Sequence, residues 1–481
     1  MLFNSFEFAI FLLITFFSYW FVFNRNLRLQ NLFIIGVSYL FYGWWDWRFL
    51  LLIAFTTGCS YLSGLWIHQI RQKQEKYYLS YAKWITATNI VLNLLILCLF
   101  KYFNFFSENL ARLFNLFGVE LDWVTLDLLL PVGISFYTFQ ALSYTIDVYK
   151  RKIEPTHDPI SFFAFVSFFP QLVAGPIERA TQLLPQFYVR RHFDYAKAVD
   201  GMRQILWGLF KKMVVADNCA TVVNQIFNNY QDQSGSTLVL GAVLFTFQIY
   251  GDFSGYSDIA IGTARLFGFN LMRNFNYPYF SRDIAEFWRR WHISLTTWFR
   301  DYIYIPLGGS RGTKWESFRN TMVIFLVSGL WHGANWTFIV WGAYHAILFA
   351  PLLLLGKNRK YTGVVAENRV FPSFRELGQM LGTFLLAVIG WIIFRAESIS
   401  QALDYMAHIC NRSLFSIPVG GKKALLFAAI LIVVEWIGRR NQFAIQNLPK
   451  NRMVRWTIYY LLVLVIFFLA GQQETFIYFQ F

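Results

Sequence analysis

Apolar stretches recur along the whole chain and are separated by short polar or basic loops. A run of about 20 apolar residues crosses a bilayer as a helix, because lipid leaves every backbone polar group to be satisfied within the segment. The pattern therefore predicts an all-α polytopic membrane protein with about 11–12 transmembrane helices. The expected crossings include the N-terminal residues, read as a retained span, and residues 31–42, 84–106, 131–149, 204–227, 341–355, 377–394, 424–437 and 457–470.

The regular alternation breaks between residues 160 and 200. Pro170, Gly175, Pro176 and Pro185 interrupt an apolar segment there, and irregular backbone of this kind cannot lie against lipid. We therefore expect a re-entrant or in-plane segment. The basic residues around it place it on the cytoplasmic side, namely Arg179, Arg190, Arg191, Lys211 and Lys212.

A second unusual stretch, YGDFSGYSDIAIG, carries several glycines and two carboxylates. Gly251, Gly255, Gly262 and the following Gly268 predict close contact between helices, because a residue without a side chain lets backbones approach. Asp252 and Asp258 are either site residues or partners of nearby arginines. We favour partners.

Composition and charge agree with a membrane protein. The 481 residues are 56% hydrophobic and only 14% charged, whereas soluble domains average about 25% charged. The net charge of +15 lies mostly in short loops, as the positive-inside rule requires, so it does not indicate nucleic-acid binding. We expect residues 71–76, 150–152, 357–360 and 439–455 to face the cytoplasm, and residues 120–127 and the C-terminus to face outward.

The four cysteines carry no recognisable site. Cys59, Cys98, Cys219 and Cys410 are scattered without a CxxC pair or metal-ligand spacing. We read them as buried free thiols and expect no bound metal.

Two histidines stand out in the stretch from Ser281 to His345. His292 lies among tryptophans and arginines, as on a surface segment at a membrane boundary. His332 lies within a predicted span, three residues before Asn335. An ionisable side chain at bilayer depth is costly and so suggests a functional site. Together they suggest proton-transfer chemistry on substrates from both sides of a membrane.

Both histidines also fit a purely structural interpretation. His332 fits a core histidine satisfied by Asn335 or by a backbone carbonyl, and His292 fits a solvated histidine at the boundary. The chain as a whole fits three classes of protein: an enzyme, a transporter of a lipid-linked or small anionic solute, and a catalytically silent scaffold of a membrane complex. A scaffold needs neither histidine.

Several ordered motifs resemble those of the membrane-bound O-acyltransferases. They are FPQLVAGPIERATQLLPQF, YGDFSGYSDIAIG, FNYPYFSRDIAEFWRRWHISLTTWFRDYIYIPLGGS and SGLWHGANWTFIVWG. The likeness is to the alginate and peptidoglycan O-acetylation branch, which is related to the teichoic-acid D-alanylation acyltransferase, and it covers nearly the whole chain. It implies one membrane domain, with N-terminal spans over 1–150, a re-entrant segment over 160–200, a catalytic region over 250–345 and an aromatic tail over 472–481. It also implies a ring of helices around a central tunnel.

The resemblance implies a reaction. An acetyl group would pass from a cytoplasmic thioester, acetyl-CoA or another acyl thioester, to a hydroxyl of an extracytoplasmic envelope polysaccharide, either an alginate-like exopolysaccharide or peptidoglycan. His332 would be the general base, because an alcohol is a poor nucleophile until its proton is removed. The other implied site residues are His292 as a second catalytic residue, and Asn335, Trp331 and Asp252 as supporting residues. Arg289, Arg290 and Arg311 are either donor-binding residues that attract the phosphates of the donor or ordinary positive-inside charge.

The tail GQQETFIYFQF has two interpretations. It fits an aromatic anchor at the membrane interface. It also resembles the short C-terminal motif of the small companion protein in the D-alanylation system, whose tyrosine is thought to carry the acyl group. That likeness implies Tyr478 as an acyl relay, with Phe476, Phe479 and Phe481 packing the tail into the funnel.

The resemblance further implies partners and a location. We expect a multi-pass protein of the bacterial cytoplasmic membrane, embedded in the lipid bilayer. The expected partners are an extracytoplasmic SGNH-type transferase or esterase and the polysaccharide acceptor, with no nucleic acid and no bound cofactor.

Overall fold

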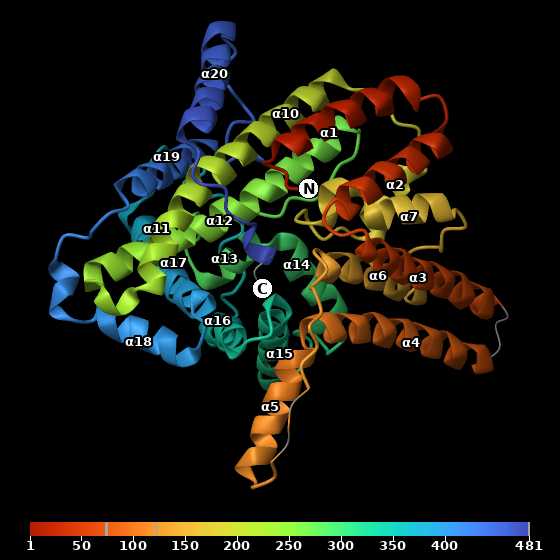
Figure 1. Ribbon diagram of the computed structural model, residues 1–481, viewed down its shortest axis with the longest axis horizontal. Coiled ribbons are helices and arrows are strands. Elements are labelled where there is room, and N and C mark those ends of the chain that lie inside the picture. Colours follow the sequence, from red (N-terminus) through yellow and green to blue (C-terminus); the bar gives the residue numbers. More distant parts are fainter. Residues whose placement is uncertain (73–75, 121, 123, 480–481) are drawn as a thin grey trace. The chain divides into compact units, whose positions relative to one another are not determined.

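The computed structural model describes residues 1–72, 76–120, 122 and 124–479, and these ranges are helical with connecting turns and no strand (Figure 1). Six helices in the described chain are long and apolar enough to cross a membrane. They are Arg48–Gln72 (α3), Ser80–Lys101 within α4, Gly235–Leu266 (α12), Trp336–Leu354 (α16), Phe374–Arg395 (α17) and Arg452–Leu469 (α20). The all-α polytopic prediction is confirmed.

The other expected crossings fall on shorter helices. These are Phe6–Phe17 (α1), extended by a π turn to Val22, Leu27–Gly43 (α2), Ile134–Tyr149 (α6), and Lys422–Gly438 (α19). The expected crossing at 204–227 falls on the end of Tyr195–Leu209 (α10), a π turn and Asp217–Asn228 (α11). The count of 11–12 transmembrane helices therefore stays a prediction. Local capping sets several helix starts. Asn451 accepts hydrogen bonds from the backbone N–H groups of Met453 and Val454, so α20 begins at Arg452 rather than near residue 457.

The chain forms two compact units, one of residues 1–201 with 263–272 and one of residues 202–262 with 273–481. In the first unit, α3 packs beside Lys76–Lys101 (α4) and α6, and α2 packs beside Pro159–Ser167 (α7) (Figure 1). The remaining helices of this unit are Phe103–Leu116 (α5), Phe169–Leu172 (α8), Ala180–Leu183 (α9), the 3-10 turn Leu184–Phe187, and the beginning of Tyr195–Leu209 (α10).

The segment rich in proline and glycine is broken into short helices, as predicted. Pro159 lies in the first turn of α7, and Pro170 lies in the first turn of α8. The side chains of Gln140 and Gln171 donate to the carbonyl oxygen of Phe165, at 2.8 and 3.0 Å. These bonds satisfy a backbone group that the interrupted helix leaves open. Its re-entrant path through lipid stays a prediction.

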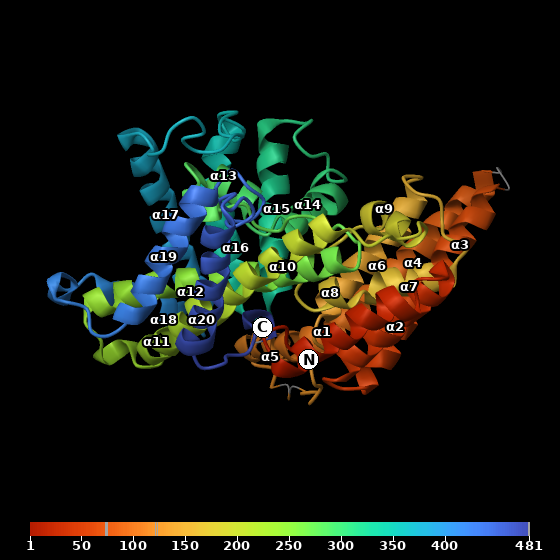
Figure 2. The ribbon, with the colours of Figure 1, turned by 90° about the horizontal axis from the view of Figure 1, so that it is seen from above.

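In the second unit, Lys314–His332 (α15) packs along α16, and α17 packs along α16 in turn (Figure 2). A π turn, Phe210–Ala216, joins α10 to Asp217–Asn228 (α11). The other helices are Ile284–Arg290 (α13), Ile293–Phe299 (α14), Ile399–Ile409 (α18), and the short turns Tyr230–Asp232, Pro278–Phe280, Arg300–Tyr304, Arg412–Phe415 and Ile477–Phe479.

Helix α12 is continuous over 32 residues through the glycine-rich stretch. Gly255 lies so close to the neighbouring backbone that an added Cβ would lie 2.8 Å from the carbonyl oxygen of Gly208. At Gly251 an added Cβ would lie 3.0 Å from the carbonyl oxygen of Lys211. The predicted close contact is confirmed at these two glycines, whereas at Gly268 an added Cβ would meet its nearest neighbour, Cβ of Arg191, only at 3.5 Å.

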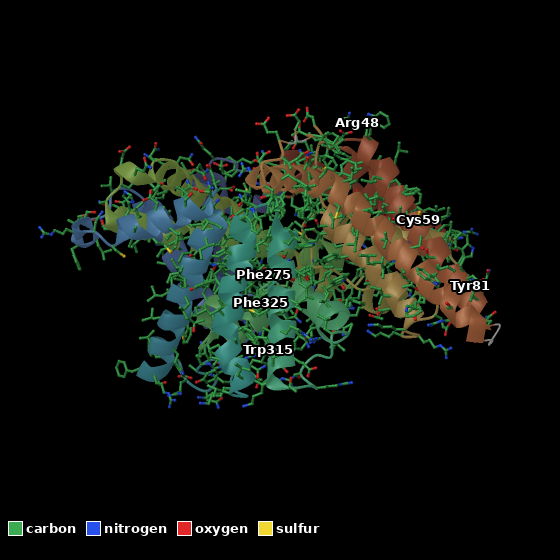
Figure 3. All side chains as sticks on the ribbon, turned by 90° about the horizontal axis from the view of Figure 1, so that it is seen from below. Arg48, Cys59, Tyr81, Phe275, Trp315 and Phe325 are labelled. Atoms are coloured by element: carbon green, nitrogen blue, oxygen red, sulfur yellow. The ribbon has the colours of Figure 1, made fainter. Side chains whose placement is uncertain are left out.

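The four cysteines are free thiols, but their expected burial holds only in part. Cys219 is buried and Cys59, on α3 (Figure 3), is half-buried. Cys98 and Cys410 are exposed on the protein surface, so the prediction is wrong for them. An apolar stretch does not require protein on every side when lipid covers the rest of the helix.

Candidate active site

A tight turn between two packed helices places His332. Helix α15 ends at His332, and α16 begins at Trp336 after Asn335 caps it by accepting from the N–H of Thr337 at 3.0 Å. The nitrogen of the same carboxamide donates to the carbonyl oxygen of Glu397 at 2.9 Å. These bonds give Asn335 a role in the turn, and its expected contact with His332 or an oxyanion stays a prediction.

Glycines let this helix pair pack closely enough to enclose the histidine. An added Cβ on Gly333 would lie 2.3 Å from Cε2 of Phe338, and one on Gly342 would lie 2.3 Å from the carbonyl oxygen of Phe325. The His332 ring is 4% exposed and lies 5.1 Å from the Trp341 ring and 5.3 Å from the Phe394 ring, between centroids. The apolar walls exclude water from the imidazole. Since α15 is not among the six long apolar helices, the placement of His332 within a membrane span stays a prediction.

His292 occupies the corner between α13 and α14. Its backbone has a φ of 43° and a ψ of 55°, in the left-handed region, and α14 begins at the next residue. The side chain is only 1% exposed, so the expected surface position at the membrane boundary is wrong. Phe253 and Phe275 pack against the ring, at centroid distances of 4.6 and 6.4 Å, and Phe275 is labelled in Figure 3. This aromatic cover withdraws the histidine from solvent.

Hydrogen bonds fix the tautomer of His292. Its Nδ1 lies 3.1 Å from Oδ1 of Asn274, which also accepts from the hydroxyl of Ser294 at 2.9 Å. An amide oxygen only accepts, so this network assigns the proton to Nδ1. Nε2 then keeps a lone pair and has no hydrogen-bond partner among the described residues. Burial lowers the pKa of His292 to about 3, so the ring is neutral at physiological pH.

The C-terminal tail turns back into the second unit after α20. The backbone N–H of Gly471 donates to the carbonyl oxygen of Met213 at 2.8 Å, and an added Cβ on Gly471 would lie 2.6 Å from the backbone nitrogen of Asn218. A larger residue at position 471 would push the tail away. Two further bonds hold the tail: Lys212 Nζ donates to the Glu474 carbonyl at 3.0 Å, and the N–H of Ile477 donates to Asp252 at 2.7 Å.

Buried charges support this docking. Lys212 is 1% exposed, and its Nζ lies 2.8 Å from a carboxylate oxygen of both Asp217 and Asp252. Beside it, Lys211 pairs with Asp258 at 2.6 Å. The two aspartates of α12 are therefore partners of basic residues, as expected, although those residues are lysines rather than arginines. Lys211 and Lys212, which count among the basic residues expected to place the re-entrant segment on the cytoplasmic side, are both buried and paired with carboxylates.

The docked tail brings Tyr478 to both histidines. Its ring centroid lies 5.6 Å from that of His332 and 6.2 Å from that of His292. Trp331, expected as a supporting residue, lies 6.2 Å from the same ring. The structure thus assembles His292, Trp331, His332 and Tyr478 around one point. Phe476 is fully buried and packs on Tyr256 at 4.3 Å, whereas Phe481 lies outside the described residues.

This arrangement contains the groups that an acyl transfer needs. A phenol is a nucleophile, and a neutral imidazole beside it accepts its proton. Burial raises the pKa of Tyr478 well above its usual value near 10, so the proton leaves only toward a base in contact. The indole N–H of Trp341 is buried without a hydrogen-bond partner among the described residues, and it lies beside His332. Such a donor suits an oxyanion.

The three arginines expected to bind the donor do not share one environment. Arg290 pairs with Glu286 at 2.7 Å and donates to the carbonyl oxygen of Gly363. Arg289 donates to the backbone carbonyls of Asn358 and Tyr361. Both therefore tie α13 to the loop that follows α16. Arg311 is exposed in the loop before α15, so of the three it is the most open to a phosphate.

Comparison with known proteins agrees with the resemblance noted in the sequence. The family model of the membrane-bound O-acyltransferases (MBOAT) matches residues 39–369, a range that contains both histidines. A probable alginate O-acetylase of Pseudomonas aeruginosa is 43% identical over 78% of this chain and 68% of its own length. A peptidoglycan O-acetyltransferase of Helicobacter pylori is 31% identical over 95% of this chain and 92% of its own length. A teichoic acid D-alanyltransferase of Bacillus subtilis is 28% identical over 55% and 69%.

Proposed function

The chain belongs to the membrane-bound O-acyltransferase family and is an O-acyltransferase, and on that premise we propose that it transfers acetyl groups to an envelope polysaccharide. The donor is a cytoplasmic thioester such as acetyl-CoA. The protein resides in the cytoplasmic membrane of a bacterium, and the acceptor lies outside it. The names of the relatives support an alginate-like or peptidoglycan acceptor.

In the first half of the proposed reaction, Tyr478 receives the acetyl group. His332 takes the phenolic proton as the oxygen attacks the carbonyl carbon of the thioester. A C–O bond forms, the C–S bond breaks, and His332 returns the proton to the departing sulfur. The products are the free thiol and an acetyl ester on Tyr478.

In the second half, a hydroxyl group from the outer side attacks this ester. The new C–O bond forms on the acceptor, the bond to the Tyr478 oxygen breaks, and the phenol regains a proton. An aryl ester is more reactive than an alkyl ester because a phenolate leaves more readily than an alkoxide. The hydroxyl belongs to an extracytoplasmic SGNH-type partner, which passes the acetyl group to the polymer.

One observation carries this proposal: the Tyr478 ring lies within 5.6 Å of His332 and 6.2 Å of His292, between ring centroids. A tail that served only as a membrane anchor would have no reason to enter a cluster of buried histidines. Phe476 and Ile477, beside Tyr478, are buried as well. This burial supports Tyr478 as the relay group.

The test is to replace Tyr478 by phenylalanine. This variant keeps the ring and its packing but loses the nucleophilic oxygen, so polymer O-acetate should fall to the level of His332→Ala. Tyr460→Phe, at an exposed position on α20, is the matched control and should acetylate normally. In addition, the purified wild-type chain incubated with acetyl-CoA without partner should give an acetylated tail peptide by mass spectrometry.

Two results would decide against parts of the proposal. Normal O-acetylation by Tyr478→Phe, with inactive His332→Ala, would mean direct transfer without a relay. Normal acetylation by His332→Ala, at wild-type protein level, would remove the assigned base as well.

A further inference from the structure

A cavity of about 870 Å³ lies entirely within the first unit, and its lining includes none of the candidate active-site residues. Its walls come from residues 185–197, from residues 265–270 and from Trp20. Arg190, Arg191 and Lys197 line it, together with Arg265, whose charge is paired with Asp200. Neither the acyl transfer nor the tail uses these residues.

Arg191 is a buried cation whose partners are all neutral. It is 6% exposed, and it donates to Oε1 of Gln30 at 3.0 and 3.2 Å and to Oδ1 of Asn31 at 2.6 Å. A fourth bond reaches the carbonyl oxygen of Gln186 at 3.3 Å. The guanidinium carbon also lies 5.8 Å from the ring of Tyr19, another neutral neighbour. No carboxylate of the described chain pairs with Arg191.

This lack of a counter-charge has an energetic consequence. Burying a charge costs several kcal/mol, and neutral hydrogen bonds or an aromatic face offset only part of that cost. The Phe269 ring lies 4.8 Å from the guanidinium carbon and supplies such a face. An anion entering the cavity would supply the missing charge.

The cavity rim adds further cations without neutralising them. Arg190 and Lys197 are exposed, and neither forms an ion pair with any carboxylate of the described residues. Asp194, the acidic residue of the lining, is turned to the first turn of α10, where Oδ1 accepts from the N–H of Lys197 at 3.1 Å. The lining therefore keeps an excess of positive charge.

Apolar side chains stand beside these cations. Val189, Phe193 and Tyr195 are 64%, 49% and 75% exposed, and the Trp20 ring packs edge-on against Phe193 at 5.5 Å. Exposed apolar and aromatic groups next to arginine and lysine suit a ligand that has both a charged and an apolar part.

We propose that this cavity binds a phosphate-bearing ligand, with Arg190, Arg191 and Lys197 around the phosphate. Guanidinium groups match phosphate oxygens through paired N–H donors, and a lysine adds a mobile point charge. The phosphate has two sources, the headgroup of an anionic phospholipid and a soluble phosphate compound. The proposal is independent of the acyl-transfer function.

The experiment uses the purified full-length protein. Native mass spectrometry of protein taken from nanodiscs of phosphatidylcholine with phosphatidylglycerol measures which lipid is retained. The variant is Arg190→Gln with Lys197→Gln, two exposed positions that leave the bonds of Arg191 intact. Lys150→Gln, also exposed in the first unit but outside the cavity, is the matched control. Retained phosphatidylglycerol should fall at least about fivefold in the variant and stay unchanged in the control, since each lost contact to a charged group weakens binding by roughly that factor or more.

A second arm tests the soluble source. Inorganic pyrophosphate is added to protein in uncharged detergent, and the thermal unfolding midpoint is followed. The soluble ligand is supported if pyrophosphate raises the unfolding midpoint of the wild type and the control but not that of the variant, and if no lipid is retained selectively. If neither lipid retention nor the pyrophosphate shift differs between wild type and variant, the proposal is wrong. Arg191→Met gives an independent check, because removal of the buried charge should abolish the same response.

Discussion

The carboxylate of Asp252 accepts a hydrogen bond of 2.7 Å from the backbone N–H of Ile477, a residue 225 positions later in the chain. The contact fixes the backbone next to Tyr478 rather than any tail side chain. Phe253, the neighbour of Asp252 on α12, packs on the Tyr478 ring at 4.4 Å. One turn of α12 thus holds both the backbone of Ile477 and the ring of the adjacent Tyr478, the expected relay residue.

Loss of the Asp252 carboxylate should release the tail. Asp252→Ala leaves the Ile477 N–H without its acceptor and leaves Lys212 with Asp217 alone. Breaking one partner of a buried ion pair costs about 3–5 kcal/mol, so the undocked population should rise by roughly 100-fold or more. Polymer O-acetate should fall accordingly. A cysteine introduced at Phe479 should become accessible to a maleimide, measured in a background without the exposed Cys98 and Cys410.

The matched control is Asp258→Ala, which breaks the neighbouring pair with Lys211 but removes no contact to the tail. It should leave the labelling of position 479 low even if it lowers stability. Equal labelling of both variants would show that the tail responds to the general loss of buried charge, and not to the bond between Asp252 and Ile477.

The sequence predicts the helices because lipid allows few alternatives, whereas their ends depend on local caps. Helix α17 was expected from about residue 377 but begins at Phe374, where Ser373 and Glu376 form a capping box. Likewise α16 begins at Trp336, because Asn335 caps it, and not near residue 341. Both capping residues can be recognised in the sequence, but a prediction from apolar periodicity alone does not take them into account.

The active site was harder to predict than the fold. Motifs single out His332 and Tyr478 as candidates, but the sequence does not show the burial of His292, because neighbouring arginines and tryptophans are typical of a membrane boundary. Lys212 falls within the expected crossing 204–227, yet it counts there only as one of the basic residues around the re-entrant segment. The charge of Lys212 is balanced by Asp217 and Asp252 on two different helices. Such tertiary pairing cannot be predicted from a single sequence. An adjacent lysine pair inside an apolar stretch was the available signal.

Gly333→Ala should impair activity through the turn that carries His332. The new methyl group would lie 2.3 Å from the Phe338 ring, which packs on Phe394 at 4.8 Å, and Phe394 packs on His332. Overpacking of this kind costs about 1–3 kcal/mol and shifts the rings. We expect slower acetylation at near-normal protein level. Gly382→Ala on α17, where an added Cβ meets nothing within 4 Å, should be silent, and a comparable loss there would contradict this account.

The basic loops give a prediction about topology. Cysteines placed at Lys150, Lys357 and Arg440 should resist a membrane-impermeant maleimide in intact cells, whereas one at Asp122 should react, because the first three belong to loops rich in lysine and arginine. Cys98 and Cys410 must be replaced first, since both are exposed. The reverse labelling pattern would invert the orientation, and residue 73 of the first basic loop lies outside the described residues.

Burial of a neutral His292 should make the protein acid-sensitive. The folded pKa, about 3, lies below the ordinary value of 6.5, so below pH 6.5 the unfolded chain binds a proton that the folded chain does not. Stability is therefore complete above pH 6.5 and falls as the pH drops toward 3. Between pH 7.5 and pH 5.0 the loss is about 2 kcal/mol, from 1.36 kcal/mol per pKa unit.

The variant His292→Asn tests this sign directly. An asparagine amide nitrogen takes the place of Nδ1 and still donates to Asn274, but it does not titrate. We expect the wild-type unfolding midpoint in detergent to drop between pH 7.5 and pH 5.0 by a few degrees more than that of the variant. The size of this shift is the lost free energy of unfolding divided by the entropy of unfolding. His345, which is also buried, is present in both proteins and cancels in this difference. An equal drop in the unfolding midpoint of both proteins would mean that solvent reaches His292. In that case the corner between α13 and α14 opens in the folded protein.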